Sequence, residues 1–233
     1  MIVFDEYEYA LELENQNIDS SYNVIKKGII LAKYYFYQGY SEDEVYKKLC
    51  QKFIVLDNGG NYDIKHAKIN IMIASAKSNP ELKRSNINFS EYELNLIHSI
   101  KDEKLEIFMF VMLCIFKFNN NNKFYVNERE ILRMCNLYWC GSLFNSMVMF
   151  LYDKGYLKIG ISKLKGVTSQ KIVYEFSDEF KKGDSPSLII KDYRNLNYQY
   201  LKYFDKDKYI NCENCGITIP KKNNRQKYCN ECK

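Results

Sequence analysis

Apolar residues recur at helical spacing through the first hundred residues, so this part of the chain is predicted to be a small helical bundle. One clear apolar face consists of Ile69, Met72, Ile73 and Ala76. Residues 1–18 are expected to be mostly irregular or to form a short acidic strand. The expected helices span about 19–38, 41–53, 64–78 and 90–100.

Capping sequences set several of these boundaries. The segments 41–44 and 90–93 both read Ser-x-x-Glu, in which the serine and the glutamate can satisfy each other's backbone N–H groups at the start of a helix. Gly39 is expected to end the first helix in a left-handed conformation. The run Asp-Asn-Gly-Gly-Asn at 57–61 is expected to be a loop.

From residue 103 onward the predicted elements include short strands as well as helices. The segment 103–118 is apolar nearly all round, which is typical of a helix at the centre of a core. Asn127 heads an analogue of the capping box, and Gly155 and Gly166 are expected at a helix end and at a hairpin tip. The expected elements after the central helix are a strand at 124–126, a helix at 127–136, a turn at 137–140, a helix at 141–153 and two strands at 156–161 and 170–176.

This ordered set of elements resembles a winged helix-turn-helix. The phrase Leu-Tyr-Asp-Lys-Gly-Tyr-Leu at 151–157 is similar to the family's usual end of the recognition helix and start of the wing. The resemblance implies that helix 141–153 enters the major groove, with Ser142, Asn145 and Ser146 as its polar candidates. No Arg or Lys lies on this helix, which weakens the prediction of strong base reading. Alternatively, the helix is mostly core and the module is a scaffold or a protein-docking domain.

Positive charge is expected to contact phosphates, which gives affinity without sequence information. The candidates lie on the preceding helix and in the wing: Arg129, Arg133, Lys163, Lys165, Lys171 and Lys158. The predicted result is modest, salt-sensitive and weakly specific binding of nucleic acid.

Four of the eight cysteines form two Cys-x-x-Cys pairs near the end of the chain, namely Cys212 with Cys215 and Cys229 with Cys232. This spacing matches a closed four-thiolate zinc site, which stabilises a fold and leaves no position for a substrate. The alternative is two disulfides. The four other cysteines lie scattered among apolar residues and no secretory start is visible, so one structural Zn²⁺ is preferred.

The finger, Cys-x-x-Cys-Gly followed by Tyr-Cys-x-x-Cys, resembles a zinc ribbon or the hairpin finger of bacterial DNA-repair glycosylases. Its loop offers four cations for phosphate contact: Lys221, Lys222, Arg225 and Lys227. Alternatively, the loop is a solvated hairpin, because a zinc tetrathiolate carries a charge of −2 and Glu213 and Glu231 flank it. Tyrosines and cations also alternate over 193–208. They are candidates for base stacking or, more simply, for packing of the finger onto the body.

Composition bounds the remaining choices. The formal net charge is only +5, so attraction to nucleic acid must come from local patches, while the first residues are acidic from Asp5 to Asp19. This acidic start either meets another partner or packs on a basic surface of the same chain. The longest apolar run, 107–116, is too short for a bilayer and no signal peptide is visible, so we expect a cytoplasmic protein without membrane contact.

No catalytic constellation is apparent in the sequence. His66 and His98 each stand alone in a predicted helix. Asp63 with Glu81-Leu-Lys83 has the residue order of metal-dependent nucleases, but Glu81 follows Asn-Pro rather than lying on a strand. We therefore expect a protein that is not an enzyme.

The sequence thus predicts a mainly α fold with small β elements (α+β), with a helical N-terminal bundle, a winged helix and a C-terminal zinc ribbon. The predicted parts are 1–100, 101–180, a connecting segment at 181–210, and 211–233. The order of these modules is similar to that of small proteins from phages and other mobile elements of AT-rich bacteria. That resemblance favours a non-enzymatic DNA- or RNA-binding protein in transcription control or replication. The alternative is an anti-defence protein that inhibits a host CRISPR-type nuclease complex, using the acidic start as a nucleic-acid mimic or the basic wing as a cover for a channel.

Overall fold

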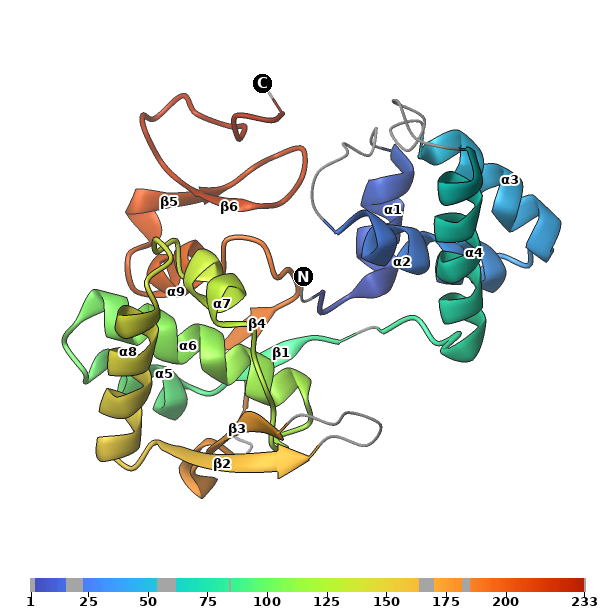
Figure 1. The fold of residues 1–233 in the computed structure, drawn as a ribbon. Helices are drawn as coiled ribbons and strands as arrows, with labels where there is room; N and C mark the ends of the chain where they lie inside the picture. The colour runs from blue at the N-terminus through green and yellow to red at the C-terminus, as the bar shows by residue number, and fades with distance from the viewer. Residues whose placement is uncertain are drawn as a thin grey trace. The chain divides into compact units, whose positions relative to one another are not determined.

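The computed structural model describes residues 3–15, 23–53, 62–83, 85–163, 170–181 and 185–232. These residues form a mainly helical α+β chain with small antiparallel sheets, as predicted. The chain divides into two compact units, unit 1 (1–85) and unit 2 (86–233), shown in Figure 1. The finer division into four parts stays a prediction. Among the described residues, no helix combines the length and the apolar character that crossing a membrane requires.

Unit 1 is a bundle of helices around one apolar core. The predicted face of Ile69, Met72, Ile73 and Ala76 is confirmed, because all four side chains are buried in that core. The predicted loop at 57–61 lies outside the described residues. The helices of unit 1 are α1 (Glu6–Asn15), α2 (Val24–Tyr37), α3 (Glu42–Lys52) and α4 (Tyr62–Ser78).

The prediction of an irregular or extended start is wrong, because residues 6–15 form α1. The Asp5 carboxylate accepts two backbone N–H groups of the first turn, at 3.0 and 2.9 Å, which caps the helix. Glu6, Ala10 and Leu13 form its buried face. Glu6 is tolerated at the start of that buried face because its carboxylate pairs with the buried Lys33 ammonium at 3.0 Å. The spacing of apolar residues alone therefore did not predict α1.

The predicted helix boundaries agree with the structure where capping residues set them. The Glu44 carboxylate accepts the Ser41 N–H at 2.8 Å, and the Glu93 carboxylate accepts the Ser90 N–H at 2.8 Å. Gly39 follows α2 with φ +89°, as its predicted stop requires.

Unit 2 is built around α6 (Glu103–Phe118), whose residues 106–116 are all buried. Phe108, Phe110 and Phe116 contact aromatic rings from three other segments of the unit. This arrangement confirms the prediction of a central helix. The other helices of unit 2 are α5 (Glu91–His98), α7 (Glu128–Met134), α8 (Gly141–Asp153) and α9 (Leu196–Phe204).

The strands of unit 2 pair as three separate antiparallel hairpins or ribbons: β1 (Ile87–Phe89) with β4 (Leu188–Ile190), β2 (Leu157–Lys163) with β3 (Gln170–Phe176), and β5 (Tyr209–Asn211) with β6 (Thr218–Pro220). The predicted strand at 124–126 is reduced to one bridge between Phe124 and Tyr174. Tyr125 and Val126 leave the sheet because the chain turns toward the cap of α7 at Asn127. The hairpin tip with Gly166 lies outside the described residues.

Between the β2–β3 hairpin and the finger, the helix α9 packs against α6. Tyr200 of α9 is fully buried, and its hydroxyl donates to the Glu106 carboxylate of α6 at 2.8 Å. The same carboxylate lies 3.0 Å from His98 Nδ1. This tyrosine is therefore a core residue rather than a base-stacking one. Figure 1 shows α9 beside the β5–β6 hairpin.

Candidate metal centre and nucleic-acid surface

Four cysteines come together at one end of the β5–β6 hairpin. Cys212 and Cys215 flank the turn after β5, where Gly216 has φ +71°, and Cys229 and Cys232 lie on the returning segment. The sulfur atoms of all four residues lie within 4.8 Å of one another. The sequence therefore predicted this cluster correctly, and the four residues are placed to hold one metal ion.

The spacing of the sulfurs fits an ion better than a disulfide. The Sγ atoms of Cys215 and Cys229 are 3.7 Å apart, and the four thiols are free. A disulfide needs about 2.05 Å, whereas a tetrahedral ion at about 2.3 Å from each sulfur sets neighbouring sulfurs about 3.8 Å apart. The donor set and its geometry therefore match a closed four-thiolate site.

The surroundings shift the pKa values of Cys212 and Cys215 in opposite directions. Burial alone would raise the pKa of Cys212, but backbone N–H groups, including that of Cys229 at 3.4 Å, lower this pKa to about 6. Partial burial and the neighbouring thiols instead raise the pKa of Cys215 to about 12. Four clustered thiols cannot all ionise without a cation, and a bound cation would supply that compensation.

Arg194 fixes the finger to the body of unit 2, a role that the sequence did not reveal. Its Nη2 donates to the backbone oxygen of Cys215 at 3.0 Å, and the Asp192 carboxylate holds the guanidinium through bonds of 2.6 to 3.0 Å. Asn195 adds a bond of 2.9 Å to the backbone oxygen of Thr218. The run Asp-x-Arg-Asn before α9 was a possible signal, but only the fold shows what it contacts.

The helix α8 presents the predicted polar residues to solvent. Ser142, Asn145 and Ser146 are all exposed on one face, which continues through Met149 and Tyr152. Ser146 donates to the backbone oxygen of Leu143 at 2.9 Å. The opposite face, with Phe144, Met147, Val148 and Leu151, is buried. One face of α8 therefore packs in the core, and the face with the candidate base-contacting residues is accessible to solvent.

The predicted cations occupy several different places. Arg129 lies over the Trp139 ring at 5.1 Å, and Lys171 lies over the Tyr125 ring at 4.4 Å. Arg133 and Lys158 are exposed. Lys163 ends β2, and Lys165 lies outside the described residues. In the finger, Lys221, Lys222 and Arg225 are exposed, while Lys227 pairs with Glu213 at 3.4 Å.

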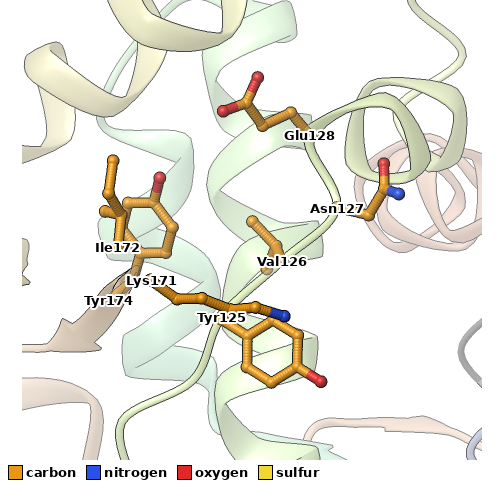
Figure 2. A pocket seen from close by; sticks show the side chains of 7 residues that line it. All are labelled: Tyr125, Val126, Asn127, Glu128, Lys171, Ile172 and Tyr174. Carbon is orange, nitrogen blue, oxygen red and sulfur yellow. The ribbon is translucent and has the colours of Figure 1, made fainter. Parts of the chain in front are cut away.

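A groove of about 350 Å³ lies between the α7 cap and β3. It exists because Tyr125 and Val126 diverge from β3 after the bridge at Phe124. Figure 2 shows the Lys171 ammonium next to the Tyr125 ring, with the Glu128 carboxylate turned away from both. Its lining residues are Tyr125, Val126, Asn127, Glu128, Lys171, Ile172 and Tyr174.

The residues of the weak nuclease-like pattern stand outside strands. Asp63 belongs to α4, whereas Glu81 and Lys83 lie in the irregular segment after it. His66 stacks on Tyr46 at 5.5 Å between ring centres. Within the described part of the chain, the group of potential metal ligands consists of the four cysteines and includes neither His66 nor Glu81.

Comparison with protein-family models, with curated proteins and with solved structures gives no match for this chain.

Proposed function

We propose that this chain is a non-enzymatic nucleic-acid-binding protein, with a winged helix-turn-helix and one structural zinc ion in its finger. The order α6, Phe124 bridge, α7, α8, β2 and β3 supports the first part, since the family arranges its helices and wing in that order. In such a module α8 would lie in the major groove, with Asn145 able to pair with adenine.

The distribution of charge carries this proposal. Residues 131–174 contain six cations and a single carboxylate, Asp153, so this segment alone has a net charge of +5, equal to that of the whole chain. Phosphate contacts need such a local excess, and α8 lies inside the segment. The six cations are Arg133, Lys154, Lys158, Lys163, Lys165 and Lys171. The exposed finger cations Lys221, Lys222 and Arg225 extend the proposed phosphate contacts.

Zinc is the proposed metal because four cysteine sulfurs in a closed cluster are its preferred structural ligand set. The site would stabilise the finger rather than catalyse a reaction, because four protein ligands leave no open position. Elemental analysis of the purified protein tests this directly. One zinc per chain is expected, and Cys229→Ser should lose it.

The biological role is also part of the proposal. A function in transcription control or replication of a phage or other mobile element rests on the resemblance of the module order and of the finger residues. DNA and RNA are both possible partners of this kind of surface, so both belong in the binding test.

The second candidate is a protein-binding inhibitor of a host CRISPR-type nuclease, and the acidic helix α1 is the feature that suggests it. Two of its carboxylates already have partners in unit 1, since Glu6 pairs with Lys33 and Glu14 accepts the Tyr35 hydroxyl at 2.5 Å. Fewer acids are thus left to imitate a nucleic-acid backbone. We therefore propose the inhibitor only as the second candidate.

Fluorescence anisotropy with labelled duplex and single-stranded oligonucleotides tests the proposal, at about 50 and 200 mM salt. Binding should weaken steeply with salt, and Lys163→Glu with Lys165→Glu should lower the slope of log K against log salt by about 1 per lysine. The matched control is Lys47→Glu with Lys104→Glu, two exposed lysines outside residues 131–174. If no nucleic acid binds at low salt, the proposal fails.

A further inference from the structure

Three aromatic side chains near α7 and α8 are largely exposed to solvent rather than packed in the core. Tyr138 is 96% exposed, Tyr125 53% and Trp139 46%, and Trp139 is the only tryptophan of the chain. Tyr138 and Trp139 occupy the turn between α7 and α8, immediately before the end of α8 that a reading helix would direct at its target. Contiguous exposed apolar side chains mark binding surfaces more often than scattered ones do, and Tyr138 and Trp139 are neighbours in sequence.

Two of these rings carry a cation on their face. The Arg129 guanidinium lies 5.1 Å from the Trp139 ring centre, and the Lys171 ammonium lies 4.4 Å from that of Tyr125. The two pairs stand at the ends of the segment 125–129, so the Cα atoms of Tyr125 and Arg129 are at most about 14 Å apart. A short stretch of one strand can therefore reach both.

We propose that this aromatic surface, made of Tyr125, Arg129, Tyr138, Trp139 and Lys171, binds single-stranded nucleic acid. The rings would stack on unpaired bases while Arg129 and Lys171 hold the neighbouring phosphates. The inference rests on the proposed function and names the form of nucleic acid that it takes.

Charge favours a polyanion over a protein partner here. Residues 131–152 contain no carboxylate, so the turn and nearly all of α8 offer nothing that repels phosphate. Asp153 stands at the far end of α8, about 18 Å along the helix from Gly141. Glu128 and Glu130 flank Arg129 in sequence. Figure 2 shows the Glu128 carboxylate turned away from Lys171 and Tyr125.

The same features argue against a duplex as the preferred ligand of this surface. In a duplex the base faces are covered by their neighbours, so only base edges and phosphates remain available to a protein. The α8 helix has no Arg or Lys for those edges. Flat, exposed rings are instead suited to bases whose faces are free, and stacking of this kind tolerates any sequence.

The single tryptophan provides a direct test in the full-length, metal-loaded protein. Its fluorescence is followed while unlabelled dT20 or rU20 is added, because a base stacked on the indole quenches emission. Anisotropy with labelled strands gives the affinity of the parent protein and of Tyr138→Ala, which removes a ring that makes almost no packing contact. Tyr92→Ala, a half-exposed tyrosine of α5, is the matched control.

Saturable quenching is expected, with Tyr138→Ala binding single strands about 5- to 150-fold more weakly and Tyr92→Ala binding them normally. A DNA or RNA preference between the two homopolymers would identify the source of the strand. Binding of duplex alone, or of single strands without quenching and without an effect of Tyr138→Ala, overturns this inference but leaves the proposed function standing. Failure to bind either form overturns both.

Discussion

Replacing Arg194 by methionine should weaken metal binding without unfolding unit 2. The variant keeps the length of the side chain but removes the guanidinium, which donates to the Cys215 carbonyl at 3.0 Å and is held by Asp192. A hydrogen bond from a charged donor contributes about 1.5–3 kcal/mol, and the partial exposure of the pair places this one at about 1.5 kcal/mol. That free energy corresponds to about a ten-fold loss of zinc affinity, within the range of other groups that orient metal ligands.

Competition with a chromophoric zinc chelator measures this change, and circular dichroism on heating follows the helices. Lys191→Met is the matched control, because it removes an exposed cation three residues away. We expect the control to bind zinc like the parent protein. Unchanged affinity in Arg194→Met, or an equal loss in Lys191→Met, would refute the claim that this guanidinium positions the metal-binding turn.

Three further outcomes are expected. Chelation of the metal should unfold the finger while the helical signal of the remaining chain persists, since zinc modules of this size gain about 10–16 kcal/mol of folding free energy from the metal. Amide hydrogen exchange over 209–232 measures the loss of structure in the finger. Gly28→Ala should destabilise unit 1 by about 1–3 kcal/mol in urea, because the new Cβ would overlap the Met72 side chain. Met72→Ala in the same chain should relieve this strain. Iodoacetamide should modify the exposed Cys140 before the buried Cys114 in the metal-loaded protein, because the Ser142 hydroxyl and nearby backbone N–H groups lower the pKa of Cys140. Ser142→Ala should therefore slow the reaction of Cys140 near pH 7. Mass spectrometry of the modified peptides measures both effects.

Local signals predicted most of the helices. Capping boxes need only four residues, so Ser90 with Glu93 identified the start of α5. The bounds of α6 and α8 agree with the sequence prediction because an apolar helix and a terminal glycine are both local features. The cysteine cluster was predictable for the same reason, since two short spacings specify four ligands.

Features that depend on distant partners were not predictable. β1 has three residues and exists only because it pairs with β4, one hundred residues later. α1 was missed because Glu6 occupies its buried face, which only the pairing with Lys33 makes tolerable. The contact of Arg194 with the Cys215 carbonyl and that of Trp139 with Arg129 likewise could not be predicted from residue spacing.

The contrast between the two units bears on which partner the chain meets. Glu6 and Glu14, two of the four acids of α1, already have partners inside unit 1. In unit 2 the segment 131–174 has a net charge of +5 in sequence, with Asp153 as its single acid. Moreover, α8 packs Phe144, Met147, Val148 and Leu151 in the core and exposes the opposite face with its polar residues. The positive charge in the sequence around α8 is therefore the feature on which the proposed binding of a polyanion rests.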